Sequence, residues 1–262
     1  MKEILIAMAI VGGLGCFIGL LLGVVSKIFA VKTDPKVTAV REALPGNNCG
    51  GCGYAGCDGL AEAIAKGEAP VSGCPVGGAE TAKVIGKIMG KEANFVRKVA
   101  FVKCSGTCDQ AKQLYHYFGA TQCHQVAQTP GRGSKACAYG CLGFGSCVQV
   151  CEYGAISVVN GCAKVDKELC TACGKCVQAC PHELIELIPY EAPYAVRCSA
   201  REKGKAVRLV CSAGCIGCGV CEKSCPVNAI TVTDNIAHIN YDLCTGCGTC
   251  VEKCPVKVIK SV

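Results

Sequence analysis

The stretch CIGCGVCEKSCP at residues 215–226 has the pattern C-x2-C-x2-C-x3-C-P, and the pattern returns as CTGCGTCVEKCP at residues 244–255. Such runs hold 4Fe–4S clusters in pairs: three close cysteines bind one cube, and the fourth, before a proline, reaches the other cube. The spacing therefore predicts two sites, one with Cys215, Cys218, Cys221 and Cys254, and one with Cys244, Cys247, Cys250 and Cys225.

Between the two runs, AITVTDNIAHINYDL at residues 229–243 alternates apolar and polar residues around Asp234-Asn235. This alternation around a turn predicts a small β-hairpin. The runs and the hairpin together are typical of a two-cluster ferredoxin unit.

An internal repeat extends this unit toward the N-terminus. A shift of 74 residues brings Cys141, Cys147, Cys151, Cys170, Cys173, Cys176 and Cys180 onto Cys215, Cys221, Cys225, Cys244, Cys247, Cys250 and Cys254. The chain is thus predicted to hold two tandem ferredoxin units. In this register Phe144 falls on Cys218, so the first unit lacks one expected ligand.

Cys137 is the first candidate to replace that ligand, and it falls on Cys211, four residues upstream of the later run. The first unit would then have one site with Cys137, Cys141, Cys147 and Cys180, and one with Cys170, Cys173, Cys176 and Cys151. Glu152 follows Cys151 where the pattern has proline, which is a second departure in the same run.

A separate cluster site is predicted near the N-terminus, in LPGNNCGGCGYAGC and the residues that follow. Its glycines let the backbone wrap a cube and direct amide N–H groups at the sulfurs. Structural zinc also accepts four thiolates and is the competing interpretation. Two helices, LAEAIAKGE and AETAKVIGKIMGKE, are predicted to follow from their spacing. The ligands of this site would be Cys49, Cys52, Cys57 and Cys74, spaced C-x2-C-x4-C-x16-C.

These assignments give five 4Fe–4S clusters, and the remaining cysteines allow a sixth. Cys104, Cys108 and Cys123 would supply three ligands, with Cys198 or Cys211 as the fourth. Alternatively Cys137 completes this sixth centre, and Cys198 or Cys211 then joins the site that lacks a cysteine at position 144. Spacing does not separate the two arrangements. Cys162 and Cys16 are interpreted as small packing residues.

The N-terminal residues 4–26, ILIAMAIVGGLGCFIGLLLGVVS, carry no charge and as a helix would span a membrane. A cleaved signal peptide is the alternative, but no clear cleavage site follows. Basic residues after this segment place the rest of the chain in the cytoplasm, which is reducing, in a single-pass topology in the cytoplasmic membrane. Gly15, Gly19 and Gly23 form a stripe that would let a helix of another membrane subunit approach.

The composition favours metal over a large conventional core. The chain has 27 cysteines, an odd number, with 33 glycines and no tryptophan. Cysteines close together in sequence suit metal centres better than long-range disulfides.

The formal charge of +7 might suggest nucleic acid. Each oxidised cube with four thiolates carries about −2, so five clusters make the net charge negative and no nucleic-acid partner is expected. No phosphate loop or dinucleotide fingerprint is present. Lys83, Lys87 and Lys91 lie on one helix face and would steer an acidic redox partner.

The predicted fold class is α+β. Residues 1–30 would be a transmembrane anchor, 31–45 a linker, 46–99 a small helical domain with one 4Fe–4S cluster, and 100–136 a cysteine-containing connector. Residues 137–197 and 198–262 would be the two ferredoxin-like units, each with two 4Fe–4S clusters. Because the metal sites do not exist in the unfolded chain, metal binding would supply folding free energy.

The order of an apolar N-terminal segment, LPGNNCGGCGYAGC, KACAYGCLGFGSC and two ferredoxin units resembles the B subunit of the Rnf complex, the ion-translocating ferredoxin:NAD+ oxidoreductase of prokaryotic membranes. The resemblance covers nearly the whole chain, in the longer form with two tandem units. It implies a polyferredoxin that accepts electrons from soluble reduced ferredoxin and passes them to other membrane subunits, with no complete active site of its own.

Three other functions stay open at this point. The chain could serve another membrane redox complex, or it could reduce a small substrate at an incomplete cluster, for which the Phe144 site is the candidate. It could also be a zinc-stabilised interaction scaffold.

Overall fold

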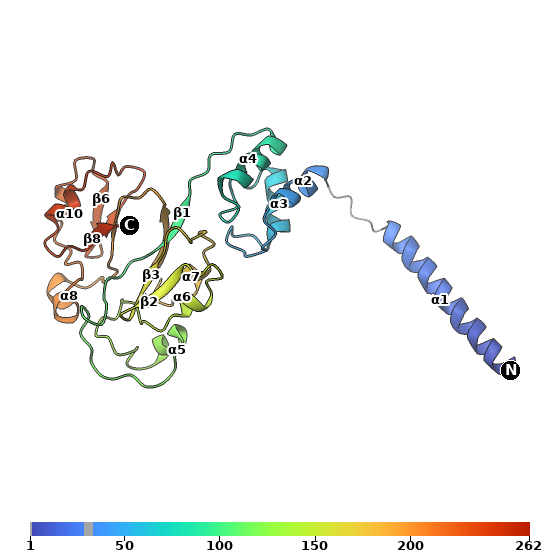
Figure 1. Ribbon diagram of the computed structural model, residues 1–262, viewed down its shortest axis with the longest axis horizontal. Helices are drawn as coiled ribbons and strands as arrows, with labels where there is room; N and C mark the ends of the chain where they lie inside the picture. Colours follow the sequence, from blue (N-terminus) through green and yellow to red (C-terminus); the bar gives the residue numbers. More distant parts are fainter. Residues whose placement is uncertain (1, 29–33) are drawn as a thin grey trace.

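The computed structural model describes residues 2–28 and 34–262. Its first element is the helix α1 (Lys2–Ile28), which extends away from the cysteine-rich part of the chain (Figure 1). Parts of the predicted anchor and linker, residues 1 and 29–33, lie outside the described residues.

The prediction of a transmembrane helix at residues 4–26 was wrong. In the described part of the chain, no helix combines the length and the apolar character needed to cross a bilayer. The stripe of Gly15, Gly19 and Gly23 has no described neighbour within 4 Å of the Cβ positions.

Three helices form the N-terminal cysteine domain: α2 (Pro35–Ala43), α3 (Cys57–Lys66) and α4 (Gly78–Met89). The two helices predicted after the first cysteines are confirmed as α3 and α4. Gly67 and Gly90 end them in the left-handed conformation, which glycine adopts without strain. A core of apolar side chains from all three helices, including Leu60, Ile64 and Ile85, lies between them.

The rest of the chain contains two similar modules, each with two short helices, a hairpin and a final strand. Module 1 holds α6 (Ser146–Gln149), β2 (Ile156–Val159), β3 (Cys162–Val165), α7 (Lys175–Gln178) and β4 (Ile185–Pro189). Module 2 holds α9 (Val220–Lys223), β6 (Ile230–Thr233), β7 (Ile236–Ile239), α10 (Thr249–Lys253) and β8 (Ile259–Ser261).

The hairpin predicted from the second unit is confirmed. β6 pairs antiparallel with β7, with Thr233 opposite Ile236. Asp234 and Asn235 both have positive φ, as a two-residue hairpin turn requires. β2 and β3 form the equivalent hairpin in module 1.

Each module is completed by a strand that precedes it in sequence. β1 (Lys98–Val102) pairs antiparallel with β4, and β5 (Tyr194–Val196) pairs antiparallel with β8. β5 lies within the range expected for unit 1 but pairs with the last strand of unit 2. Two further helices, α5 (Cys123–Gln128) and α8 (Gly204–Val210), lie in the segments before each module.

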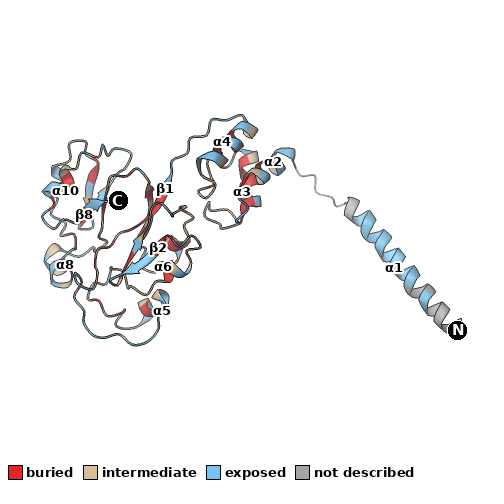
Figure 2. Cartoon of the chain, viewed as in Figure 1, coloured by how far each residue is buried: buried red, intermediate tan, exposed pale blue. Residues whose placement is uncertain are grey.

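Much of the core of these modules consists of cysteine and small aliphatic side chains. Buried residues are concentrated in α3 and along β1 (Figure 2), where the last four residues of β1 are all buried. No disulfide pairs the cysteines that the structure describes. Cysteine thiols thus occupy positions that larger apolar residues fill in most proteins of this size.

Candidate metal centres

Cys52, Cys57 and Cys74 lie together at the N-terminal end of α3, and with Cys49 they make up the predicted set that we call site 1. Asn48 positions the start of the helix, since its side-chain oxygen accepts a 2.8 Å hydrogen bond from the Cys57 N–H. The Gly77 N–H donates to Cys74 Sγ at 3.3 Å. Burial raises the pKa of Cys74, and the charges of Cys57 and Cys52 add to the rise, so these sulfurs are near neighbours.

Site 2 lies in module 1 and contains Cys151, Cys170, Cys173 and Cys176. The structure brings these four predicted ligands together around one small cavity. Cys170 Sγ accepts hydrogen bonds from the N–H groups of Ala100, at 3.3 Å, and Ala172, at 3.5 Å. The absence of proline after Cys151 therefore does not remove this cysteine from the set.

Site 3 contains Cys123, Cys141, Cys147 and Cys180, which line a second cavity of module 1. Cys123, from the connector, occupies the place in this set that the repeat suggested for Cys137. It begins α5, and its N–H donates a 2.8 Å hydrogen bond to the hydroxyl of the buried Ser146. Phe144 packs edge-on against Tyr117 of the connector, with ring centroids 5.3 Å apart.

Site 4 lies between the modules and contains Cys104, Cys137, Cys198 and Cys211. Gly106 lies beside the sulfurs of both Cys104 and Cys211. A Cβ built on this glycine would be 3.4 Å from Cys104 Sγ and 3.7 Å from Cys211 Sγ. Burial raises the pKa of Cys137, and the charges of Cys104 and Cys211 contribute in the same direction. The Ala200 N–H donates to Cys198 Sγ at 3.4 Å.

Sites 5 and 6 lie in module 2. Site 5 contains Cys215, Cys218, Cys221 and Cys254, which line one cavity together with Gly217 and Gly219. Site 6 contains Cys225, Cys244, Cys247 and Cys250. Ala229 N–H donates to Cys225 Sγ at 3.3 Å, and Cys225 and Cys250 belong to one packed core.

Backbone shape brings each cluster loop against the turn of the neighbouring hairpin. Gly143 has a φ of 85°, and a Cβ there would stand 2.6 Å from Gly161 O. Gly217, its counterpart in module 2, has a φ of 62° and would meet Asn235 O at 2.7 Å. Only glycine fits either position, so both modules hold their cysteine loops by the same contact.

The six sites form a row in which each touches the next. A Cβ on Gly51 of site 1 would stand 2.2 Å from Cys173 O of site 2. Cys176 of site 2 and Cys147 of site 3 share one core, as do Cys221 and Cys250 of sites 5 and 6. The contacts between sites 3 and 4 and between sites 4 and 5 are main-chain hydrogen bonds: Cys141 N–H to Cys104 Sγ at 3.4 Å, and Cys215 N–H to Cys198 Sγ.

Cys162 is a buried thiol between sites 3 and 4 that belongs to neither set. Its single S–H group donates to Cys104 O at 3.5 Å. Its sulfur also lies close to the sulfurs of Cys104 and Cys141, and hydrogen bonding with Cys162 lowers the pKa of Cys104 to about 7 and that of Cys141 to about 6. The same contacts raise its own pKa, so Cys162 is the proton donor. Burial raises the pKa of Cys147 and of Cys176 to about 12.

One predicted candidate ligand lies apart from these sets: Cys108, which is exposed beside Gly161. Cys16, which was expected to be a packing residue, is exposed on α1. Among the described residues, no three His, Cys, Asp or Glu side chains are close enough to hold one metal ion. A cube is held differently, because its four thiolates bind four irons.

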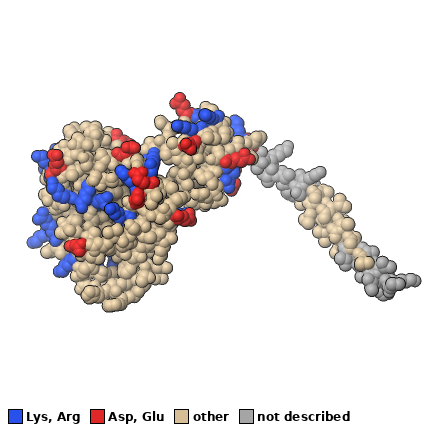
Figure 3. All heavy atoms as spheres, in the orientation of Figure 1, with Lys and Arg blue, Asp and Glu red and all other residues tan. Residues whose placement is uncertain are grey.

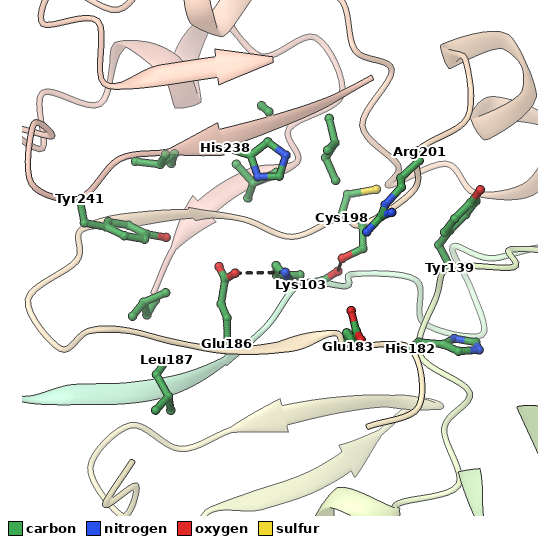
Figure 4. Close-up of a pocket in the computed structure, with 16 residues that line it drawn as sticks. Lys103, Tyr139, His182, Glu183, Glu186, Leu187, Cys198, Arg201, His238 and Tyr241 are labelled. Atoms are coloured by element: carbon green, nitrogen blue, oxygen red, sulfur yellow. Dashed lines mark hydrogen bonds and ion pairs between the residues drawn. The ribbon is translucent and has the colours of Figure 1, made fainter. Parts of the chain in front are cut away.

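A cavity of about 300 Å³ lies between the two modules (Figure 4). Lys103 and Glu186 form an ion pair across it, with Nζ and Oε2 3.1 Å apart. Arg201 and Glu183 also line it, so its charge is mixed, and Cys198 is its one proposed ligand thiol among the described lining residues. No single class of charged substrate is favoured by this lining.

The sequence pattern missed Cys123 in site 3, although one signal was available. Cys137 and Cys211 are counterparts in the repeat, and the later unit already has eight ligands without Cys211. Neither cysteine is therefore expected inside its own module. The structure places both in site 4, between the modules.

Models of three known families match the chain. "Putative Fe-S cluster" matches residues 44–76, which include all of site 1. "4Fe-4S binding domain" matches residues 163–186, and "4Fe-4S dicluster domain" matches residues 214–258. The chain therefore binds several 4Fe–4S clusters.

Three known relatives are similar over most of the chain. The B subunit of the Na(+)-translocating ferredoxin:NAD(+) oxidoreductase complex of Acetobacterium woodii is 47% identical over 92% of this chain and 73% of its own length. The B subunit of the ion-translocating oxidoreductase complex of Methanosarcina acetivorans is 45% identical over 92% of both chains. The B subunit of the proton-translocating ferredoxin:NAD(+) oxidoreductase complex of Clostridium ljungdahlii is 40% identical over 93% of this chain and 86% of its own.

Proposed function

Because the chain belongs to the family of B subunits of ion-translocating ferredoxin:NAD+ oxidoreductase complexes, as these relatives show, we propose that it takes electrons from reduced ferredoxin and relays them to other subunits. It is an electron-transfer subunit of such a complex. The observation that carries the proposal is the unbroken row of six cysteine sets described above.

The proposed ligands are the four cysteines of each of sites 1 to 6, which give six clusters. The fit to a 4Fe–4S cube is supported by the cavities of sites 2, 3 and 5, each lined by four cysteines. It is also supported by main-chain N–H groups directed at the sulfurs, an arrangement that stabilises a negatively charged cluster. Each bound cluster would accept and release one electron at a time.

The residues of the row have two tasks. The cysteines and their hairpins fix the spacing between neighbouring sites, and the buried aliphatic residues around them exclude water. Exclusion of water lowers the local dielectric and strengthens each hydrogen bond to a thiolate. The bound clusters would therefore carry the electrons, and the residues of the chain would fix the distances between the clusters.

Ferredoxin, as the electron donor, would dock on module 2. Lys and Arg side chains gather on this part of the visible face (Figure 3). Those around α8 are exposed: Arg201, Lys203, Lys205 and Arg208. Cys218 of site 5 and Cys247 of site 6 are also exposed, so electrons could enter close to this surface. A basic face favours an acidic partner and raises its rate of association.

The complex of these relatives translocates ions and is associated with a membrane. We place the cysteine domains of this chain on the cytoplasmic side, because free thiols and iron–sulfur ligands require a reducing compartment. The electrons would pass from the row to the other subunits, where the NAD-linked reaction takes place.

The first test is the amount of iron, acid-labile sulfide and zinc per chain in the anaerobically purified full-length protein. We expect about 24 iron and about 24 sulfide, because six cubes each hold four of both. About 20 iron would leave one of the six sets without a cluster. Zinc in place of iron would contradict the electron-transfer function.

A second test concerns the docking face. Charge reversal of Lys203 and Lys205 to Glu should slow reduction by ferredoxin and weaken its salt dependence, since surface attraction is screened by salt. Reversal of Lys83 and Lys87 on the exposed face of α4 is the matched control and should leave the rate unchanged. If only the α4 variant slowed reduction by ferredoxin, the docking face would lie near site 1 instead of on module 2.

A further inference from the structure

Lys135 is a buried cation that pairs with no carboxylate among the residues that the structure describes. Its exposed fraction is 8%, and none of the ion pairs among the described residues includes it. Lysine is rarely buried, because removing an ammonium group from water costs several kcal/mol unless the charge is compensated. Its position therefore needs an explanation.

Three main-chain carbonyl oxygens surround the ammonium. Nζ donates to Gly106 O at 2.7 Å, to Cys141 O at 2.9 Å and to Gly161 O at 2.5 Å. A neutral amine has only two N–H donors, whereas an ammonium group has three. The three acceptors thus match the three N–H donors of an ammonium group and leave none of its hydrogens without a partner.

The three carbonyls belong to the loops that separate sites 3 and 4. Cys141 is a ligand of site 3, and the Gly106 N–H donates to Cys104 Sγ of site 4 at 3.3 Å. Gly161 precedes Cys162, the thiol that bridges the two sites. The ammonium thus lies at the junction of the two central sites of the row.

Electrostatics agree with this placement. The pKa of Cys141 is lowered chiefly by the Cys162 hydrogen bond, and the Lys135 charge acts in the same direction. Burial raises the pKa of Cys211 in site 4, and Lys135 opposes that rise. Its positive charge therefore acts on a cysteine of site 3 and on a cysteine of site 4.

We propose that Lys135 is a fixed positive charge that raises the reduction potentials of the clusters held at sites 3 and 4. An electron added to a cluster brings one more negative charge and no proton, and a nearby buried cation stabilises that charge. The donor of the electron is the neighbouring cluster or, in the test, a chemical reductant. The negative clusters in turn supply the missing counter-charge for the ammonium. Lys135 thus acts through its charge, and it makes reduction of the two central clusters of the row more favourable.

This inference rests on the proposed ligand sets, so the test first identifies the two clusters. In an anaerobic redox titration followed by electron paramagnetic resonance, the signals absent from Cys123→Ala belong to site 3, and those absent from Cys137→Ala belong to site 4. If neither variant loses a signal, the ligand sets fail, and this failure is distinct from that of the role of Lys135.

The decisive variants are Lys135→Met and Lys135→Gln in the full chain. Both remove the charge, and Gln keeps amide donors for the carbonyls. At a fixed solution potential, the ratio of reduced to oxidised cluster at sites 3 and 4 should fall about tenfold, which is about 59 mV for a one-electron couple. Lys135→Arg keeps the charge and should stay within about threefold of the unmodified protein.

Lys112→Met is the matched control. Its carbonyl accepts from Ala136 N–H at 2.9 Å and its N–H donates to Val210 O at 2.8 Å, but its side chain is exposed, where water screens the charge. It should shift neither potential. Unchanged potentials in an iron-replete Lys135→Met or Lys135→Gln protein would overturn the proposal. Loss of iron from sites 3 and 4 in both uncharged variants would also overturn it, because Lys135 would then be a structural clamp.

Discussion

The backbone N–H of Cys141 donates a 3.4 Å hydrogen bond to Sγ of Cys104, across 37 positions of sequence. The bond joins a module-1 loop to a residue that follows β1, outside the repeated unit. Sites 3 and 4 therefore share a main-chain contact, and a change at one site should be felt at the other.

Cys123 and Cys137 should have separable roles. Cys123→Ala is expected to lose about four iron per chain from site 3, and Cys137→Ala about four from site 4, because each removes one of four ligands. Iron analysis with electron paramagnetic resonance distinguishes them, since different signals disappear. Cys108→Ala is the control and should keep all its iron, because Cys108 is exposed and belongs to no set. Loss of the same signal from Cys123→Ala and Cys137→Ala would contradict the division of ligands.

Cys162→Ala should keep the full iron content of about 24 per chain, because Cys162 is not a ligand. It removes the proton donor that faces Cys104 and Cys141, and hydrogen bonds to cluster sulfurs raise the potential. Because one S–H group serves one acceptor at a time, the potential should fall at the site whose sulfur accepts that hydrogen bond, and the other site should change less. A redox titration measures this, and a loss of about four iron would instead assign Cys162 as a ligand.

Gly51→Ala should weaken the docking of the N-terminal domain on module 1. Its Cβ would stand 2.2 Å from Cys173 O, a backbone atom that cannot turn aside, and overpacking of this kind costs about 1–3 kcal/mol. Electron transfer between sites 1 and 2 should slow, as measured by rapid mixing with a reductant. Gly59→Ala in α3 meets only Tyr54 Cβ at 3.8 Å and should leave the rate unchanged. Equal rates in both variants would show that the two domains do not need this contact.

Cluster loading should weaken as the pH falls. Cysteine thiols must lose their protons to bind iron, and burial raises the pKa of Cys147 and Cys176 to about 12 and that of Cys221 to about 11. These groups are fully protonated at pH 8, so each releases a proton on binding, and the apparent affinity drops about tenfold per proton for each pH unit lost. A pH-stat reconstitution measures the protons released.

The same raised pKa values make the metal-free chain less stable as the pH rises, whereas cluster binding weakens as the pH falls. A thiol with a raised pKa in the folded state stabilises the fold fully below its unfolded value of 9.0, and this stability is lost as the pH rises toward about 12. Any structure that survives iron removal should therefore melt at lower temperature at pH 10.5 than at pH 8, as circular dichroism can measure. A higher melting temperature at pH 10.5 would mean that the buried thiols are not protonated.

The hairpins and the cysteine sets of sites 1, 2, 5 and 6 follow from local spacing, because a run such as residues 215–226 fixes its own loop geometry. The long-range pairings do not. β1 is a short apolar strand whose partner β4 lies more than eighty positions away, and no periodicity indicates such a pairing. Site 4 draws on four separate segments for the same reason. Spacing grouped Cys104 with Cys198, Cys211 or Cys137, but it also grouped Cys104 with Cys108 and Cys123, which lie outside site 4.

The scattered ligands of site 4 imply an order of events during protein synthesis. The ligands of sites 2 and 3 are all present once residue 180 has left the ribosome, whereas site 4 must wait for Cys198 and Cys211. Because domains form from the N-terminal end as the chain emerges, the ligand loops of module 1 can assemble before the contacts that join it to module 2. A nascent chain stalled between residues 180 and 211 would hold the ligands of sites 2 and 3 but not the complete ligand set of site 4.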